Sequence, residues 1–597
     1  MRSDAFSAGM GRPLPWREHL AVCVLLGLAC AALHHGALRV GWTFDDPAHL
    51  RMAVTHSPWQ YFTQREVMLQ QSYAHVSPWN VLFYEIGLPW AGLDARGHHL
   101  HLLAVLWAAA WASWALLRRG CGFAAALTGA LVFLAMPATA VVGQMLMTGH
   151  YAYGLLFSVL GIHSWAAALE RAGAGRHGRA SAFALLAALL YALACLCKEL
   201  YAPLPAVLLF FPAARVTLRQ RMLLLLPSVG VAGAYLLLRW WLFDGVGGYA
   251  SLNVDEHAMP PWTTVLEELR VLLMGAGALG WAALAALVLL LGLGVAGRRP
   301  RRAPAGSGAV LFWGACAVAV LLPVVPLAKS GTLSFGHHRV ALAMAWALAV
   351  AAAWALHRAP RGAWLVAAAL AALLVMGQRH TSQLIAQFSQ PNATQYAFQL
   401  ASAAQDRLVP RDFQRISYLR DMAAVIEHWE GRPSATVVVD EDALVALGPL
   451  EGARAQAWAD ECRCVRPLGA DYQQKVSDWL ERLSRGLGKP LQVEIELHSA
   501  GLRKALRWRL SGQEDAPRAW LDAVGVGRLD LSGPQGTFAF GLDNTLPMPD
   551  PLGLRLTVQT RDGALIRSPV FHLPLAGSPA QHWSSAAASP ASAERAE

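Results

Sequence analysis

Two adjacent carboxylates, Asp45 and Asp46, follow directly after the first long apolar stretch of the chain. A carboxylate can accept the proton of an attacking hydroxyl group, and carboxylate oxygens can also bind a divalent cation. At the edge of a low-dielectric region such a pair can have altered pKa values. A structural role is also open, because Asp46 could cap a helix whose first residue is Pro47. Capping leaves Asp45 unexplained and is compatible with a chemical role.

A second group of charged residues could bind phosphate. Lys198 and Glu199 follow the apolar run Leu-Ala-Cys-Leu-Cys. Arg339, preceded by His337 and His338, opens a later apolar stretch. Lysine attracts phosphate as a point charge, and arginine binds it through a planar guanidinium. The alternatives are a Lys–Glu pair that neutralises itself and an arginine that reaches an interface from a helix end.

Further residues of possible chemical use are histidines and cysteines. His98 and His150 begin two apolar stretches, but no spacing among the histidines is diagnostic of a metal site. Cys462 and Cys464 form a lone Cys-x-Cys pair in a polar region, too few for a zinc site by themselves. A disulfide to a cysteine elsewhere and free thiols are both open.

The elements that must position these residues are membrane helices. Of 597 residues, 55% are hydrophobic and 15% are charged. Soluble domains carry more charge, about 25% of their residues. The 23 tryptophans suit membrane interfaces. The net charge of +10 does not indicate a nucleic-acid partner, because the arginines cluster in short loops between apolar stretches.

About eleven stretches approach the roughly 20 apolar residues that cross a bilayer. They lie near 19–40, 99–118, 122–143, 151–170, 180–197, 201–213, 221–243, 275–296, 308–328, 338–357 and 362–380. The sixth is short, and Pro203 and Pro205 interrupt its start. With the fifth, it predicts a hairpin whose tip reaches an aqueous cavity.

Arginine sorts the connecting loops into two alternating sets. The arginine-rich set contains Arg2, Arg12, Arg17, Arg118, Arg119, Arg171, Arg176, Arg179, Arg215, Arg219, Arg221, Arg298, Arg299, Arg301, Arg302, Arg358 and Arg361. The positive-inside rule places this set in the cytoplasm. It therefore places the N-terminus inside, and both Asp45–Asp46 and everything after residue 380 outside. Two outer loops are long, 41–98 with many aromatic residues and 244–274 with an amphipathic helix.

The character of the chain changes after residue 380. Residues 381–490 predict a mixed α/β segment. From 491 to 576 apolar residues alternate with polar ones in short runs, which predicts a β-sandwich. The Ala/Ser/Pro-rich tail, 577–597, is expected to be disordered.

These features together resemble the GT-C superfamily of polytopic membrane glycosyltransferases, over roughly residues 15 to 380. The first outer loop opens with Phe44-Asp45-Asp46, and Lys198-Glu199 lies at the turn between the fifth and sixth helices. A large second outer loop and an outward C-terminal region complete the pattern. The acidic pair and the Lys-Glu pair are similar to those of protein O-mannosyltransferase-like members. The chain departs from the members with tetratricopeptide repeats, because no such repeats follow.

The resemblance implies an inverting transfer of a sugar from a polyprenyl-phosphate donor to a hydroxyl acceptor. Asp45 is expected to be the base, with Asp46 capping, orienting the acceptor or helping to hold a divalent cation; the two could exchange roles. Lys198 and Arg339 would bind the donor phosphate. Residues that could support the site are Glu199, His337, His338, His98 and His150. No cofactor is certain; a metal, if used, would be Mg or Mn.

The composition suggests a GC-rich bacterium, hence the inner membrane, with the site and the C-terminal region in the periplasm. The acceptor would be a glycan, a lipid or a protein. Three other functions stay open. They are a lipid-linked glycan transporter or flippase, a surface-polysaccharide polymerase or ligase, and a non-catalytic membrane scaffold.

Overall fold

The computed structural model divides into two compact units. It describes residues 15–72, 74–212, 216–243, 245, 262–297, 307–321, 339–411, 416–446, 455–468, 470–489, 491–500, 503–511, 516–524, 527–531, 533–541, 551–574 and 580–584. The helical unit comprises Met1–Gly41, Ala74–Ala250 and His257–Phe388. The mixed unit comprises Trp42–Tyr73, Ser251–Glu256 and Ser389–Glu597. The first long loop is thus divided, because its residues 42–73 pack with the C-terminal region.

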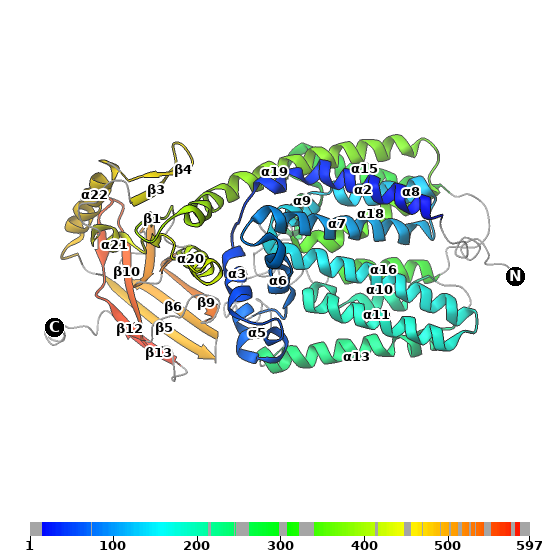
Figure 1. Cartoon of the computed structure of the whole chain (residues 1–597), viewed down its shortest axis with the longest axis horizontal. Coiled ribbons are helices and arrows are strands. Elements are labelled where there is room, and N and C mark those ends of the chain that lie inside the picture. The colour runs from blue at the N-terminus through cyan, green and yellow to red at the C-terminus, as the bar shows by residue number, and fades with distance from the viewer. Residues whose placement is uncertain are drawn as a thin grey trace. The chain divides into compact units, whose positions relative to one another are not determined.

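The helical unit is a bundle of long apolar helices (Figure 1). Among the described residues, eight helices are long and apolar enough to cross a membrane. They lie at Trp16–Arg39, Ala95–Leu117, Leu146–Gly173, His177–Cys197, Leu218–Phe243, Gly277–Ala296, Arg339–Arg358 and Ala363–Ala401. The pair α8 (Phe123–Ala135) and α9 (Pro137–Gln144), bent by 58°, makes a ninth if it is one span. The prediction of many apolar helices is therefore confirmed.

Two of the eleven predicted spans have a different form. The sixth is reduced to α12 (Leu204–Leu209), which is too short to cross a bilayer. Pro203 and Pro205 lie at its start, where a missing N–H is tolerated, so they explain where this helix begins. The ninth appears as α16 (Ser307–Leu321), and residues 322–328 of that prediction lie outside the described residues.

Small residues bring the helices of the bundle close together. A Cβ atom at Gly129 of α8 would lie 2.7 Å from Cβ of Ala353 in α18 (Leu342–Arg358). A Cβ atom at Gly294 of α15 (Gly277–Ala296) would lie 2.6 Å from Cβ of Ala355. Close backbone approach through small residues is typical of membrane helices, where packing replaces the hydrophobic drive.

The first part of the mixed unit consists of short helices. They are α3 (Asp46–Thr55), α4 (Gln60–Thr63) and α5 (Arg65–Gln71). Helix α3 packs on α20 (Ile416–Glu430) of the C-terminal region. The Tyr396 hydroxyl, on α19 (Ala363–Ala401), donates a hydrogen bond to the Phe44 carbonyl over 3.3 Å. These contacts explain why residues 42–73 belong to this unit.

A four-stranded sheet follows, with strand order β2-β1-β3-β4. Its strands are β1 (Arg407–Val409), β2 (Thr436–Val437), β3 (Ala455–Ala459) and β4 (Cys464–Pro467). Strand β1 is parallel to β2 and β3, and β4 is antiparallel to β3. Helices α20, α21 (Glu441–Ala446) and α22 (Ala470–Gly486) accompany it, so the segment is mixed α/β.

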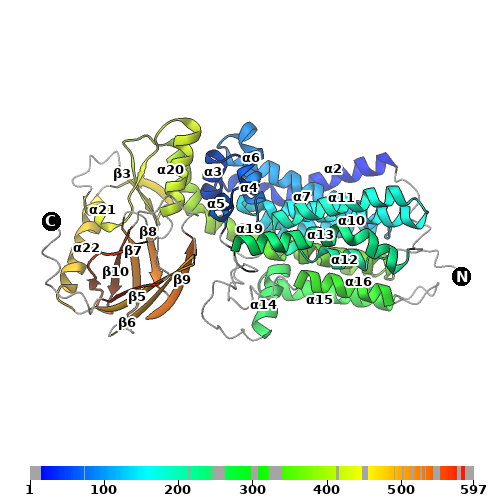
Figure 2. The same ribbon diagram turned by 90° about the horizontal axis from the view of Figure 1, so that it is seen from below.

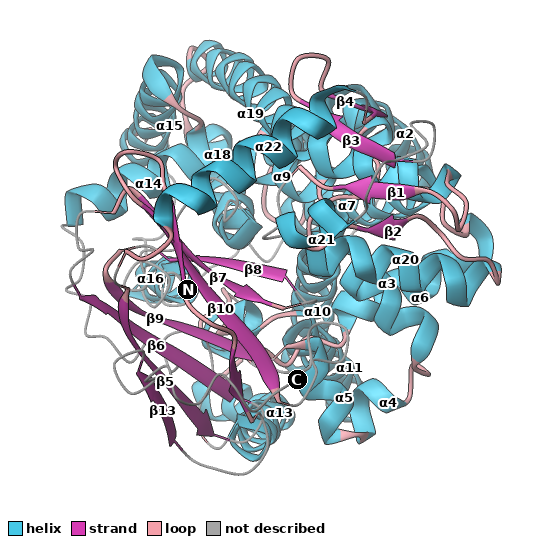
Figure 3. Ribbon diagram, turned by 90° about the vertical axis from the view of Figure 1, so that its left-hand side faces the viewer, coloured by secondary structure: helices cyan, strands magenta, loops and turns pink. Residues whose placement is uncertain are grey.

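Two antiparallel sheets then form a β-sandwich (Figure 3). One sheet has the order β13-β5-β6-β9 and the other β11-β10-β7-β8, with β12 also paired to β10. The strands are β5 (Gln492–Ala500), β6 (Arg503–Ser511), β7 (Arg518–Ala523), β8 (Gly527–Leu531), β9 (Gln535–Gly541), β10 (Leu552–Gln559), β11 (Leu565–Arg567), β12 (Phe571–Leu573) and β13 (Ala580–Ser584). Alternate residues such as Ile495, Trp508 and Leu556 form the shared core, as their period of two predicts.

The tail differs from its predicted disorder. Strand β13 lies inside 577–597 and pairs with β5 from Ala580–His498 to Ser584–Glu494. The expectation of disorder is therefore wrong for 580–584, because an edge of the first sheet supplies backbone partners that composition does not reveal. Residues 585–597 lie outside the described residues.

Candidate functional site

Lys198 and Glu199 occupy a sharp turn in the helical unit. Helix α11 (His177–Cys197) ends before Lys198, whose backbone is extended, and the short 3₁₀ helix η3 (Glu199–Tyr201) follows. The turn rests on α10 (Gly149–Gly173), because a Cβ atom at Gly154 would lie 2.2 Å from the Tyr201 ring. The Tyr201 hydroxyl donates to the Tyr151 carbonyl over 2.6 Å. The tip of the α11–η3 turn is therefore held firmly by its neighbours.

Glu199 is the centre of a charged cluster. Its Oε1 lies 2.6 Å from His75 Nδ1 and 4.0 Å from Lys198 Nζ. Its Oε2 lies 3.9 Å from Nη1 of Arg239, on α13 (Leu218–Phe243). Figure 2 shows α13 running beside α11, which brings Arg239 to this turn. We call His75, Lys198, Glu199 and Arg239 the Glu199 cluster.

The Glu199 cluster is largely removed from solvent and carries an excess of positive charge. The side chains of Lys198 and Arg239 are 12% and 6% exposed. Burial alone would raise the pKa of Glu199, but His75, Lys198 and Arg239 outweigh burial and hold that pKa well below its usual range. Burial also lowers the pKa of His75, so with Glu199 ionised and His75 neutral two cations of the cluster face one carboxylate. Charges in such a poorly solvated place act on a bound ion more strongly than surface charges do.

Arg239 and His75 were not among the residues that the sequence singled out. Arg239 stands in the run Leu-Leu-Leu-Arg-Trp-Trp, and an isolated charge inside an apolar stretch is itself a sign of function. It is held by aromatic rings, with its Cζ 5.8 Å from the Tyr235 ring centroid and 5.5 Å from that of Phe243. His75 gave no comparable signal, because its partner Glu199 lies far along the chain and only the fold joins them.

The other predicted members of this site lie elsewhere or outside the described residues. Arg339 is half-buried at the start of the α18 span and is not among the ionic partners of Glu199. His337 and His338 lie outside the described residues. His98 is buried on α7 (Ala95–Arg118), its Nε2 3.0 Å from the Gly92 carbonyl, which is a local structural contact. His150 is buried on α10, its ring 4.4 Å from that of Tyr151.

Asp46, in the mixed unit, has a structural environment. It is fully buried, and its Oδ2 accepts hydrogen bonds from the Thr43 N–H over 2.6 Å and the Thr43 hydroxyl over 3.2 Å. Its own N–H donates to the Thr43 carbonyl over 3.0 Å. Helix α3 begins at Asp46 with Pro47 next, one residue earlier than the capping interpretation predicts. The carboxylate therefore closes the turn before the helix instead of capping from the preceding position.

Asp45 has the opposite environment. It is half-buried, and its carboxylate makes no hydrogen bond or ion pair with any residue that the structure describes. The preceding Phe44 has a φ of 42°, a left-handed conformation that is uncommon for a bulky residue. Such strained backbone is concentrated at functional sites, where surrounding contacts maintain it. The hydrogen bond from Tyr396 to the Phe44 carbonyl is one such contact.

A second buried charge pair lies in the mixed unit. Arg51 of α3 places its Nε 2.7 Å from Oδ1 of Asp421 on α20. Asp421 is fully buried, and burial raises its pKa to about 6 although Arg51 opposes the shift. Arg51 is the one ion-pair partner of Asp421 among the described residues. The pair joins the two helices whose packing defines this part of the fold.

The arrangement of possible ligand side chains does not support a metal site among the described residues. In the part of the chain that the structure describes, no three side chains of His, Cys, Asp or Glu lie close enough together to hold a metal ion.

Comparisons with known proteins add no family to this geometry. No protein-family model matches the chain, and no curated protein matches its sequence.

Proposed function

We propose that this chain is an inverting glycosyltransferase that moves a sugar from a polyprenyl-phosphate donor to a hydroxyl acceptor. The observation that carries the proposal is the excess positive charge of the Glu199 cluster. Its two poorly exposed cations, Lys198 and Arg239, lie beside one carboxylate and can attract the single negative charge of a sugar phosphodiester. The GT-C resemblance of the Asp-Asp and Lys-Glu pairs supports the same reaction.

The chemistry of the leaving group explains why such a cluster is useful. When the bond between the sugar C1 and the phosphate oxygen breaks, the phosphate gains negative charge. Fixed cations near that oxygen stabilise the transition state more than the ground state, which accelerates the reaction. Lys198 and Arg239 are the cations assigned to this role. Arg339 keeps its predicted role as a further phosphate ligand.

We assign the role of general base to Asp45. The acceptor hydroxyl must lose its proton as its oxygen attacks C1, and a carboxylate whose lone pairs are free can take it. Asp45 meets this condition among the described residues, whereas Asp46 already accepts two hydrogen bonds from Thr43. Asp46 is assigned to holding the turn that presents Asp45. No metal is assigned.

The arginine pattern of the loops sets the orientation of the proposal. The N-terminus would lie in the cytoplasm of a bacterium, and Asp45, the Glu199 cluster and the C-terminal region would face the periplasm. The acceptor would be a glycan, a lipid or a protein of the cell envelope. The C-terminal region would bind this acceptor or a partner.

The test is a transfer assay in membranes with polyprenyl-phosphate-linked hexoses and pentoses. The variants Asp45→Asn, Asp46→Asn and Lys198→Met are compared with wild type at matched expression, with exposed Glu66→Gln on α5 as the control. Asp45→Asn is expected to lose activity by about 10²- to 10⁴-fold, the usual contribution of a general base. Full activity of Asp45→Asn would remove the base assignment. No transfer by wild type with any donor and any envelope acceptor would favour the transporter or the scaffold.

A further inference from the structure

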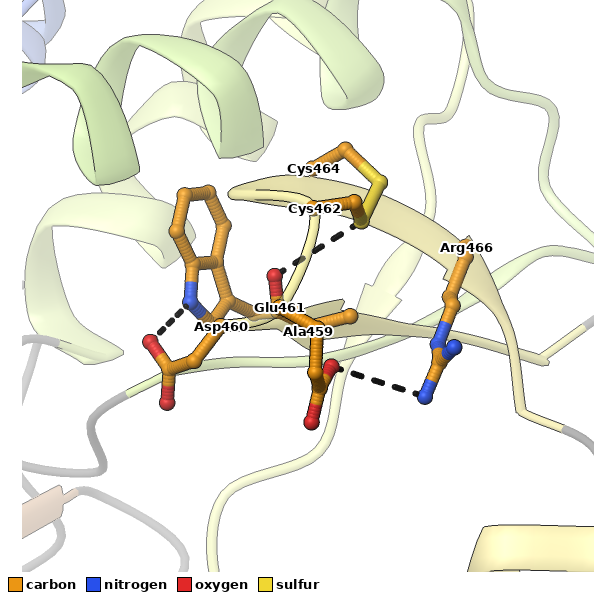
Figure 4. Close-up of a disulfide and its surroundings, with 7 residues drawn as sticks. Ala459, Asp460, Glu461, Cys462, Cys464 and Arg466 are labelled. Atoms are coloured by element: carbon orange, nitrogen blue, oxygen red, sulfur yellow. Dashed lines mark hydrogen bonds and ion pairs between the residues drawn. A yellow bond between two sulfur atoms is a disulfide. The ribbon is translucent and has the colours of Figure 1, made fainter.

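A disulfide joins Cys462 and Cys464 at the end of a hairpin in the mixed unit (Figure 4). Strands β3 and β4 are antiparallel, with Ala459 opposite Cys464. Residues 460–463 connect them. The two cysteines have Cα atoms 5.2 Å apart and are separated by Arg463 alone. The sequence suggested only free thiols or a more distant partner, so the pairing within Cys-x-Cys is new.

This disulfide is badly placed to stabilise the fold. The stabilisation from a disulfide grows with the length of chain that it closes, and a single intervening residue is close to the minimum. The hydrogen-bonded β3–β4 pair already fixes the hairpin. The other cysteines that the structure describes are free and lie in or beside apolar helices, so none shares the environment of this pair.

The disulfide is open to attack. Cys462 is exposed at the hairpin end, and Cys464 is half-buried at the start of β4. Exposed disulfides are the ones that exchange with external thiols, because the attacking sulfur needs a free approach. Arg463 has a φ of 50°. This left-handed backbone costs energy for any residue with a Cβ atom. The pairing of β3 with β4 maintains this turn conformation.

The surrounding charges favour a thiolate. Arg463 lies within the ring, Arg466 pairs with Glu461 over 3.6 Å, and Arg411 pairs with Asp460 over 3.4 Å. Three arginines thus accompany two carboxylates, and Lys475 adds a further positive charge near Asp460. Positive surroundings stabilise a cysteine thiolate, both as leaving group and as nucleophile.

We propose that Cys462–Cys464 is a redox-active disulfide that exchanges with the dithiol of a partner oxidoreductase. A partner thiolate attacks Sγ of Cys462, the S–S bond breaks, and Cys464 leaves as a thiolate that takes up a proton. The second partner thiol loses its proton and attacks the partner's sulfur in the mixed disulfide, and Cys462 leaves as a thiolate that takes up a proton. Two electrons and two protons pass to the cysteine pair, and the partner dithiol becomes a disulfide. This inference is independent of the sugar transfer.

The test uses the purified full-length protein in detergent, incubated with reduced glutathione as a model thiol without denaturant. Thiols are then trapped with a maleimide polymer that adds mass for each cysteine. We expect two more labels on wild type after glutathione, and no such gain on the Cys462→Ser/Cys464→Ser double variant. With oxidised glutathione, Cys464→Ser is expected to form a mixed disulfide at Cys462 at least about tenfold faster than Cys462→Ser forms one at half-buried Cys464.

The thermal stability of the double variant distinguishes a disulfide that exchanges with thiols from one that stabilises the fold. The double serine variant is expected to unfold at nearly the same temperature as wild type. Resistance to glutathione until the protein unfolds would overturn the proposal, as would a large fall in unfolding temperature for the double variant. The purified protein could instead contain Cys462 and Cys464 as free thiols. Reversible formation of the disulfide with oxidised glutathione would then support the proposal, and failure to form it would contradict the proposal.

Discussion

Glu199 in the helical unit and Asp421 in the mixed unit are both carboxylates held against arginine, but their surroundings differ in charge. Glu199 has His75 and the two cations Lys198 and Arg239 as partners, so two cations contact one carboxylate. Asp421 has Arg51 alone in ion-pair contact among the described residues, although the charge of Arg420 also lowers its pKa without such a contact. The comparison indicates that two cations in contact with one carboxylate, and not burial alone, separate a candidate anion site from an ion pair that joins helices.

The largest effect is expected from breaking the balanced pair. Arg51→Ala leaves the buried Asp421 carboxylate without its cation and should lower the free energy of unfolding of the mixed unit by about 3–5 kcal/mol at neutral pH. Chemical unfolding followed by tryptophan fluorescence measures this loss. The double variant Arg51→Met/Asp421→Leu should recover most of it, since neither charge remains buried. A double variant as unstable as Arg51→Ala would contradict a purely structural pair.

The pH dependence of unfolding sharpens the same comparison. Burial raises the folded-state pKa of Asp421 to about 6, above the value of about 3.9 in an unfolded chain. The folded state therefore holds this proton more tightly, so the stabilisation is complete below a pH of about 3.9 and is lost as the pH rises through about 6. Ionisation of Asp421 should therefore lower the free energy of unfolding by about 3 kcal/mol between a pH of about 3.9 and a pH above about 6.

Asp421→Asn cannot ionise, so it should remove this part of the slope. Unfolding of both proteins at a series of pH values measures the difference. Parallel pH profiles for wild type and variant would show that Asp421 keeps an ordinary pKa.

The adjacent residues Asp45 and Asp46 are expected to differ in their contribution to the free energy of unfolding, by a smaller amount. Asp46→Ala leaves the buried Thr43 N–H and hydroxyl without their acceptor and should cost about 1–3 kcal/mol of unfolding free energy. The Asp45 carboxylate has no hydrogen-bond or ion-pair partner among the described residues. Its replacement by alanine should therefore change that free energy by about 0.5 kcal/mol at most. Thermal unfolding of both variants side by side decides the matter. Equal losses would mean that Asp45 also has a structural role.

Local patterns predicted much of the fold. Apolar length identified the helices of the bundle, and alternation at Val493, Ile495 and Leu497 predicted a sandwich strand because side chains of period two face one core. The features that the sequence did not predict depend on contacts between distant segments. Two examples are the pairing of β13 with β5 and the packing of α3 on α20, because neither contact produces a periodic pattern within its own segment.

The candidate site was predicted in part for the same reason. Lys198 and Glu199 stood out because charges at the end of an apolar stretch are rare. His75 could not be found this way, because its contact with Glu199 exists only in the folded chain. Arg239 could have been found as a lone charge in an apolar helix. Asp45 and Asp46 have different environments because the turn at Thr43 binds the carboxylate of Asp46. Two adjacent identical residues in a sequence give no sign of this difference.

Binding of a short-chain polyprenyl phosphate to the purified protein tests most directly whether the Glu199 cluster binds an anion. Lys198→Met should weaken binding by about 10- to 100-fold, because one charged contact is lost. Glu199→Gln should bind at least as tightly as wild type, since it removes the negative charge, and Glu170→Gln, from the Arg119 pair, serves as the control. Unchanged affinity in Lys198→Met, or weaker binding in a folded Glu199→Gln, would contradict the account.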